Sequence, residues 1–490
     1  MVTEGIEINT DWTSAKDTAD VGTNPVKMAD LILHDLRLAK DPTQSLYFYK
    51  SGVYVKDGET AVKEMYKKYM NAFGWRDRWN DRLEDRIIKF LKTEKAVPDL
   101  LDRPILNKIN LLNGIYDLYE EEDKAFSYPS PDYLTTTQIP IVYDPDAKCL
   151  AWDKFLNEVF PEIGGADLLI QVIGLCMIPL TTMQKSIVLL GTGNNGKGIF
   201  LRALQAAIGK NNISNVALHK LSGSQERFNL GPIVGKLVNI FGDIPVKKLE
   251  DSSQFKAITG EDTVTVEYKG KQPFSYTPFC RLIFSCQKKV IPTDDDSDGF
   301  KRRIMYIPFA RVFNNDGPKV GLDILHSLSQ PYELSGLFNK ILTFLPDLIE
   351  NDFKLTAEAA DVIDNYVPVP VEIRNWLITN IESCDAGFIP TRALFNYYCQ
   401  HCPGPGGEGF DRIQLTMYIK NLFPDVISNH ATRVWKGENP IKAYKGIRFK
   451  DPTTQNEILS EAYALTIWDT KSSNNDSPVG IANGIHNSEL

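Results

Sequence analysis

A glycine-rich run with one lysine is the part of this sequence best suited to bind phosphate. Gly191, Gly196 and Lys197 fit the spacing G-x-x-x-x-G-K of nucleotide-binding loops. Glycines let the backbone bend so that several N–H groups face one anion, and the lysine can meet the β- and γ-phosphates. We therefore expect the nucleotide to contact the whole run, which is Gly191, Thr192, Gly193, Asn194, Asn195, Gly196, Lys197 and Gly198.

The residue after the lysine departs from this pattern. It usually carries a hydroxyl group that helps to hold Mg²⁺, and here it is Gly198. Water can complete the metal's ligand shell, so we expect ATP and Mg²⁺ to bind nonetheless. The alternative is a glycine-rich turn that binds nothing.

Polar residues downstream supply the other groups that an ATPase needs. Asp243 follows an apolar strand and can hold the metal and orient water, with Glu250 and Asp251 as weaker candidates. Gln287 ends another strand and can position water or sense the γ-phosphate. Arg302 and Arg303 precede a third strand, and an arginine can stabilise charge on a neighbouring subunit's nucleotide. Each has an ordinary structural explanation alone, but their order between residues 191 and 303 favours catalysis.

Several predicted elements would position these residues. A strand at 186–190 runs into the loop and a helix at 197–208 follows it, while further strands are expected at 236–241 and 281–285. This alternation predicts an α/β core. Further elements are expected on both sides: helices at 26–40, 60–98, 151–179 and 318–366, strand pairs within 46–55 and 108–118, a linker at 367–371, and helical patches ending in a strand within 371–450. The polar ends, 1–25 and 471–490, are expected to be flexible and disordered, respectively.

An alternating segment at 263–279 predicts a β-hairpin with a basic, aromatic tip. Lys269 and Lys271 flank Gly270 and could meet DNA phosphates, and Tyr268 could stack on a base. The alternative is a surface hairpin with solubilising lysines.

Composition bounds the class of protein. The 490 residues carry a net charge of -9, with 43% hydrophobic residues, which is typical of a globular protein of about three domains. The acidic balance argues against a protein that coats DNA with its whole surface. Seven cysteines, the absence of a signal peptide and the absence of a long apolar run predict a cytoplasmic protein without a membrane span. Cys399, His401 and Cys402 lack a second ligand pair, so we expect no zinc there.

Residues 186–309 resemble the motor of superfamily 3 helicases, in particular the poxvirus-type NTPase and phage/plasmid primase-helicase family. The resemblance rests on the G-x-x-x-N-G-K loop, on the K-x-x-T-G-x-D run at 256–262, on Phe284-Ser-Cys-Gln287 with Pro292, and on the arginine pair followed by Pro308-Phe309. Upstream, residues 113–118 and 143–152 resemble that family's N-terminal module. Gln287 departs from the family's usual Asn, and no polymerising primase domain is apparent.

The resemblance implies an α/β P-loop ATPase core of the AAA+-like type at 151–366, a mixed α+β N-terminal module at 26–150 and a winged-helix-like DNA-binding module at 371–450. It implies an ATP-dependent DNA helicase of phage or plasmid replication that works as a hexameric ring on single-stranded DNA and DNA forks, in the host cytoplasm, with a separate primase or initiator as a possible partner. Two alternatives stay open. One is a replication initiator or DNA-remodelling ATPase without processive unwinding, and the other is a non-catalytic nucleotide-binding scaffold.

Overall fold

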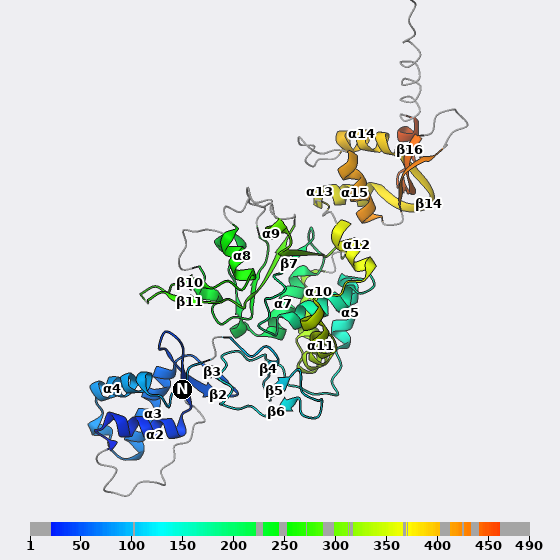
Figure 1. Ribbon diagram of the computed structural model, residues 1–490. Coiled ribbons are helices and arrows are strands. Elements are labelled where there is room, and N and C mark those ends of the chain that lie inside the picture. The colour runs from blue at the N-terminus through cyan, green and yellow to red at the C-terminus, as the bar shows by residue number, and fades with distance from the viewer. Residues whose placement is uncertain are drawn as a thin grey trace, which may run out of the picture. The chain divides into compact units, whose positions relative to one another are not determined.

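The computed structural model divides the chain into two compact units, Met1–Asn365 and Tyr366–Leu490 (Figure 1). It describes residues 21–100, 103–221, 229–244, 252–270, 272–287, 298–311, 313, 317–365, 369, 371–401, 412–423, 426–432 and 441–460. The first unit contains the parallel sheet, and each unit is described by itself below.

The first unit opens with helices that pack around a small antiparallel sheet. Its elements are α2 (Pro25–Asp35), β1 (Leu38–Lys40), β2 (Leu46–Lys50), β3 (Val53–Val55), α3 (Gly58–Ala72), the 3₁₀ turn η1 (Arg76–Arg78) and α4 (Asp81–Thr93). The Asn24 side chain accepts from the Val26 N–H and caps α2. The helix expected over 26–40 ends early, because Leu38 pairs with Phe48 and the chain joins a sheet there.

A second antiparallel sheet and two helices lead to the core. They are β4 (Lys108–Asn110), β5 (Ile115–Asp117), β6 (Phe126–Ser127), α5 (Leu150–Val159) and α6 (Gly165–Leu175). The strands turn at Asn113-Gly114, as expected. A Cβ at Gly114 would lie 2.3 Å from the Ser127 carbonyl oxygen, so only glycine fits this turn.

The core of the first unit is a five-stranded sheet in the order β13-β7-β12-β9-β8, and every neighbouring pair is parallel. The strands are β7 (Ser186–Leu190), β8 (Ile213–Ser214), β9 (Val238–Phe241), β12 (Arg281–Cys286) and β13 (Ile304–Pro308). All residues of β7 and β12 are buried, as in a sheet covered on both faces. The predicted α/β class of the core is confirmed, and the structure shows in addition that its sheet is parallel.

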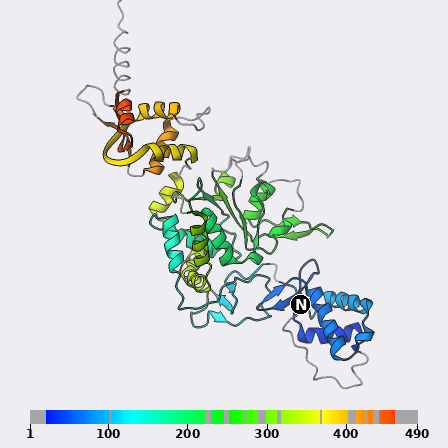
Figure 2. The ribbon, with the colours of Figure 1, turned by 180° about the vertical axis from the view of Figure 1, so that it is seen from behind.

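Helices and one hairpin surround this sheet (Figure 1, and Figure 2 from behind). They are α7 (Lys197–Ile208), η2 (Lys210–Asn212), η3 (Leu218–Leu221), η4 (Gly231–Ile233), α8 (Ser253–Thr259), the hairpin strands β10 (Val264–Val266) and β11 (Phe274–Tyr276), α9 (Asp298–Lys301), α10 (Gly317–Leu328), α11 (Pro331–Asn351) and α12 (Ala357–Asn365). Helix α10 packs against α7 and α5, and α11 packs against α6. These contacts place α5 and α10 beside the helix that follows the glycine-rich loop.

The second unit alternates helices with an antiparallel sheet of order β14-β16-β15. Its elements are α13 (Val371–Asn380), β14 (Ile381–Pro390), α14 (Thr391–His401), α15 (Arg412–Leu422), β15 (Ile427–Thr432) and β16 (Ile441–Phe449). Strand β14 falls where the sequence predicts only helical patches, because its residues pair with β16. Cys399 lies on α14 and is exposed. In the described part of the chain, no helix has the length and apolarity that a membrane span requires.

Candidate nucleotide-binding site

The carboxyl ends of three parallel strands form one cleft of about 1140 Å³. The glycine-rich loop follows β7, Asp243 follows β9, and Gln287 follows β12. Parallel strands end at the same edge of a sheet, and ligands of open α/β proteins bind there. The cleft's lining includes the loop from Gly193 to Gly198, Asp243, Ser285 and Gln287, with α5 and α10 as its other walls.

The loop bends through left-handed backbone conformations that suit a phosphate cradle. Gly193, Asn194 and Gly196 have φ values of 115°, 48° and 84°. Helix α7 begins at Lys197, and its N-cap is Gly196, which has no side chain to cover the first N–H groups of the helix. Those N–H groups and the positive end of the helix dipole therefore face the cleft, an arrangement that favours an anion. Gly191 and Thr192, the first two residues of the loop, are buried.

Lys197 is buried in the floor of the cleft. Its Nζ donates to the Gly191 carbonyl oxygen at 2.6 Å and to Asn195 Oδ1 at 2.9 Å. Burial lowers the pKa of this lysine to about 8, while the charges of Asp243 and Cys286 act in the opposite direction. An ammonium group kept in a dry site with only neutral acceptors is well placed to attract phosphate oxygens.

Asp243 is exposed to the cleft at a tight turn with φ of 53°. Its N–H donates to Ser285 Oγ at 3.0 Å, and the next N–H, of Ile244, donates to the Ser285 carbonyl oxygen at 2.9 Å. Ser285 thus fixes the direction of the acid from the neighbouring strand. Sequence reasoning assigned no role to Ser285, although it lies two residues before Gln287.

The acid site fits a magnesium ion better than a metal that needs many protein ligands. Among the described residues, no group of three or more His, Cys, Asp or Glu side chains is arranged to hold a metal. Magnesium keeps several waters and needs one or two carboxylates besides the nucleotide phosphates. Asp243 alone satisfies that need. A Cβ at Gly198 would meet nothing within 4 Å, so there is open space where a hydroxyl group could stand.

Arg302 and Arg303 lie at the amino ends of the parallel strands, whereas the loop lies at their carboxyl ends. The Arg303 carbonyl oxygen accepts from the Ser186 N–H at 2.7 Å, which places the arginine pair at the start of β7. Lys197 follows the end of that five-residue strand, roughly 16 Å away at about 3.3 Å per residue. Arg302 is exposed, whereas Arg303 is partly buried and donates to the Gly299 carbonyl oxygen at 2.6 Å.

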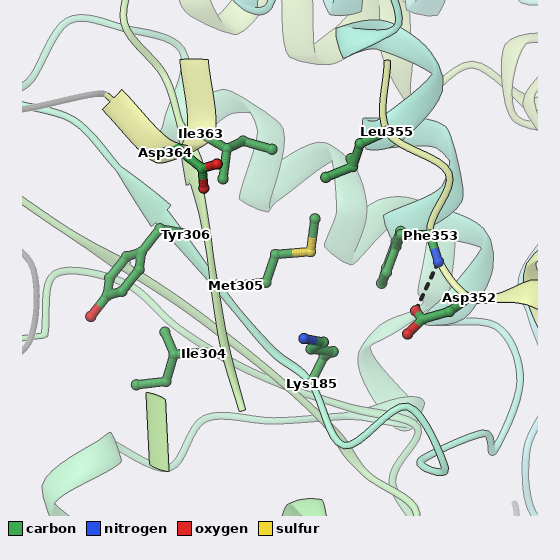
Figure 3. Close-up of a pocket in the computed structure, with 9 residues that line it drawn as sticks. All are labelled: Lys185, Ile304, Met305, Tyr306, Asp352, Phe353, Leu355, Ile363 and Asp364. Atoms are coloured by element: carbon green, nitrogen blue, oxygen red, sulfur yellow. Dashed lines mark hydrogen bonds between the residues drawn. The ribbon is translucent and has the colours of Figure 1, made fainter. Parts of the chain in front are cut away.

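A second cavity of about 370 Å³ lies beside β13, α12 and the segment before α12 (Figure 3). Its walls are mostly apolar, with Met305, Phe353 and Ile363 among them, and its carboxylates are Asp352 and Asp364. The Nζ of Lys185, the basic group of its lining, donates to the Arg302 carbonyl oxygen at 2.9 Å. Two carboxylates and a lysine that already has an acceptor make this cavity a poor setting for phosphates.

The hairpin has the strands and tip that its sequence predicts. Val264 pairs with Tyr276 and Val266 with Phe274. The Tyr268 ring stacks on Phe274 at 5.7 Å, and its hydroxyl donates to the Gly231 carbonyl oxygen at 3.4 Å. Phe274 and Gly231 therefore both pack against that ring, which is half-buried. Lys269 is exposed, Gly270 has φ of 78°, and Lys271 lies outside the described residues.

Comparisons with known proteins cover both the N-terminal part and the cleft. Residues 47–161 match a family described as "D5 N terminal like", and residues 189–303 match one described as "Family of unknown function (DUF5906)". The second match begins in β7 and ends at Arg303. It thus spans the loop, Asp243, Gln287 and the arginine pair.

One curated relative is the "Putative helicase L207/L206" of Acanthamoeba polyphaga mimivirus, with 25% identity over 214 residues. The alignment covers 42% of this chain and 22% of that protein, so the chain spans about a fifth of its relative's length. Solved apo structures of the NrS-1 C-terminal region cover 86% of this chain and 99% of theirs, with 14% identity and TM-scores of 0.41 and 0.42.

The fold defines an α/β protein with a parallel sheet. Residues 47–161 are similar to a D5 N-terminal-like domain, and part of the chain is similar to a putative helicase of a virus.

Proposed function

We propose that this chain is an ATP-dependent DNA helicase that translocates on single-stranded DNA during replication of a phage, plasmid or related mobile element. The observation that carries the proposal is the cleft in which Lys197, Asp243 and Gln287 meet at one edge of a parallel sheet. In it, the loop N–H groups bind the phosphates of ATP and Lys197 neutralises their charge. Asp243 would hold Mg²⁺, which would offset the negative charge of the phosphates when bound.

Strand order supports the role of Gln287. Numbered along the chain from β7, the strands lie in the order 5-1-4-3-2. The strand that ends at Gln287 therefore lies between the loop strand and the acid strand. In this proposal, its amide would contact the γ-phosphate or the attacking water. On these grounds we assign the core to P-loop ATPases of the AAA+-like, superfamily 3 type.

The arginine pair supports a ring with shared sites. Arg302 is exposed at the edge of the sheet that its own nucleotide cannot reach. If it acts on a nucleotide, that nucleotide would lie in a neighbouring subunit's cleft, as in a head-to-tail assembly such as a hexameric ring. Lys269 and Lys271 of the hairpin would face the central channel and contact the phosphates of one DNA strand.

The second unit supports a DNA-binding accessory role. Its order of elements, α13-β14-α14-α15-β15-β16 with a three-stranded antiparallel sheet, is that of a winged helix. We assign it to that class. The proposed setting is the host cytoplasm, where a separate primase or initiator would load or accompany the ring.

A strand-displacement assay tests the proposal, with Lys197→Ala as its control. The wild type is expected to hydrolyse ATP, to do so faster with single-stranded DNA, and to displace an annealed strand. Hydrolysis and DNA distortion without displacement would favour the initiator or remodelling alternative. ATP binding without turnover would favour a nucleotide-binding scaffold.

A further inference from the structure

Asn195 is buried within the glycine-rich loop, with 3% of its surface exposed. Its Nδ2 donates to the Phe309 carbonyl oxygen at 3.0 Å, and its Oδ1 accepts from Lys197 Nζ at 2.9 Å. Both ends of the amide thus have partners within the protein. Asn195 does not need a phosphate to satisfy it, unlike an ordinary ligand residue of such a loop.

Phe309, whose carbonyl oxygen accepts from Asn195, is held in place by the sheet and by helix α7. Phe309 directly follows β13, and its N–H donates to the Leu190 carbonyl oxygen at 2.8 Å, which extends the pairing of β13 with β7. Its ring is fully buried and lies edge-on to Phe200 of α7, with 5.7 Å between centroids. Asn195 therefore connects the loop to a point held by both the sheet and helix α7.

Gly191 leaves space for this arrangement. A Cβ at Gly191 would lie 2.0 Å from Asn195 Nδ2 and 2.8 Å from the Phe309 carbonyl oxygen. No real Cβ approaches so closely, so alanine at 191 must push the amide away. Glycine is needed at 191 because the Asn195 amide packs closely against it. This packing is a second, independent observation that the fold holds the Asn195 side chain in one position.

We propose that Asn195 is a positioning residue that fixes Lys197 toward the phosphates by tying the loop to the carboxyl end of β13. This rests on the proposed binding of ATP phosphates by Lys197. A lysine has a long flexible stem, and a second acceptor besides the Gly191 carbonyl oxygen limits the conformations of its ammonium group. Without Asn195, the ammonium group keeps one acceptor. The loop loses its side-chain bond to Phe309 and keeps the backbone bond from the Phe313 N–H to the Asn194 carbonyl oxygen.

A double-mutant cycle between Asn195 and Lys197 tests the proposal through binding of a non-hydrolysable ATP analogue with Mg²⁺. Asn195→Ala is expected to weaken binding about tenfold or more, since a hydrogen bond to a charged group is lost. In the Lys197→Ala background the same change is expected to cost less than about twofold, because the group it positions is gone. A tenfold loss that persists without Lys197 would overturn the proposal and make Asn195 a direct phosphate ligand.

Two further measurements separate positioning from general damage. Gly191→Ala is expected to reproduce the binding loss of Asn195→Ala, and the double variant to bind no worse than Gly191→Ala alone. Losses that multiply in the double variant would contradict the proposal. Asn157→Ala is the matched control, because that exposed amide bonds only to the Asp153 carbonyl oxygen of its own helix. Analogue binding by the wild type tests the proposed function separately, and unchanged melting temperatures show that the variants fold.

Discussion

The carbonyl oxygen of Arg303 accepts hydrogen bonds from both the N–H and the hydroxyl of Ser186, at 2.7 and 2.9 Å. These bonds fix the arginine pair at the amino end of the strand whose carboxyl end leads to the phosphate loop. Within one chain, the pair and the loop are held apart by the length of that strand. Within one chain, this arginine pair therefore does not reach the cleft, although Arg202 lines it.

Arg302 is the better candidate for stabilising charge on a neighbouring subunit's nucleotide, and we predict that Arg302→Ala assembles and binds ATP but hydrolyses it ~10³-fold or more slowly. Arg302 is exposed, whereas Arg303 donates to Gly299 and its pKa is lowered by burial and by the adjacent Arg302. The measurement is steady-state ATPase with a parallel binding assay.

Mixing Arg302→Ala with Lys197→Ala subunits checks that the site is shared. Interfaces that keep both residues are expected to recover activity in proportion to their frequency. If mixed rings stay inactive at every ratio, although subunit exchange is demonstrated, the arginine does not act across an interface.

The pKa of Lys197 predicts how nucleotide use depends on pH. The phosphate-binding form is the ammonium group, and burial lowers its pKa from 10.5 to about 8 in the free protein. The charged fraction therefore falls as pH rises through about 8, and kcat/KM for ATP should fall with it. Bound phosphates favour the charged form, so kcat should hold to higher pH. Lys197→Arg stays charged throughout this range, so any kcat/KM that it retains should not fall as the pH rises through about 8. If its kcat/KM falls as in the wild type, another group causes the fall.

Substitutions at Asp243 and at Gly198 are expected to have opposite effects on the use of Mg²⁺ in hydrolysis. Asp243→Asn should spare ATP binding but stop hydrolysis, because the carboxylate that holds the metal is lost. Gly198→Ser places a hydroxyl group in open space at the start of α7, where hydroxyl-bearing residues of such loops reach the metal. It should lower the Mg²⁺ concentration needed for half-maximal ATPase several-fold. If Asp243→Asn changed only DNA affinity, Asp243 would not be the metal ligand.

Local sequence pattern predicted much of the core, because buried strands and glycine turns have strong local signals. The strand at Ser186–Leu190 and the helix at Lys197–Ile208 fall where apolar spacing places them. Strand β14 did not, because its pairing partner lies some 60 residues further along the chain. The bond from Asn195 to Phe309 could not be predicted from the sequence either, because the two residues are 114 positions apart and no spacing rule joins them.

Within the hairpin tip, the predicted stacking residue Tyr268 already has partners in the protein. Tyr268 is engaged with Phe274 and Gly231, so Lys269 is the described tip residue that carries an exposed charge. We predict that replacing Lys269 and Lys271 with alanine weakens binding to single strands for all sequences alike. The slope of log affinity against log salt should become shallower by about 0.7 for each lost contact. Basal ATPase should survive, because the hairpin forms a sheet of its own, apart from the sheet that carries the loop, and unwinding should be lost.

The control for this last prediction removes the same charge elsewhere. Lys124 and Lys354 are exposed and pair with Glu121 and Asp347 at the surface. Replacing both with alanine should leave binding, its salt slope and unwinding near the wild type, since exposed pairs contribute little to stability. If the hairpin variant unwinds as well as this control does, the tip does not move DNA. The strand-moving contacts would then have to be sought in the second unit, whose helix α15 presents an exposed Arg412.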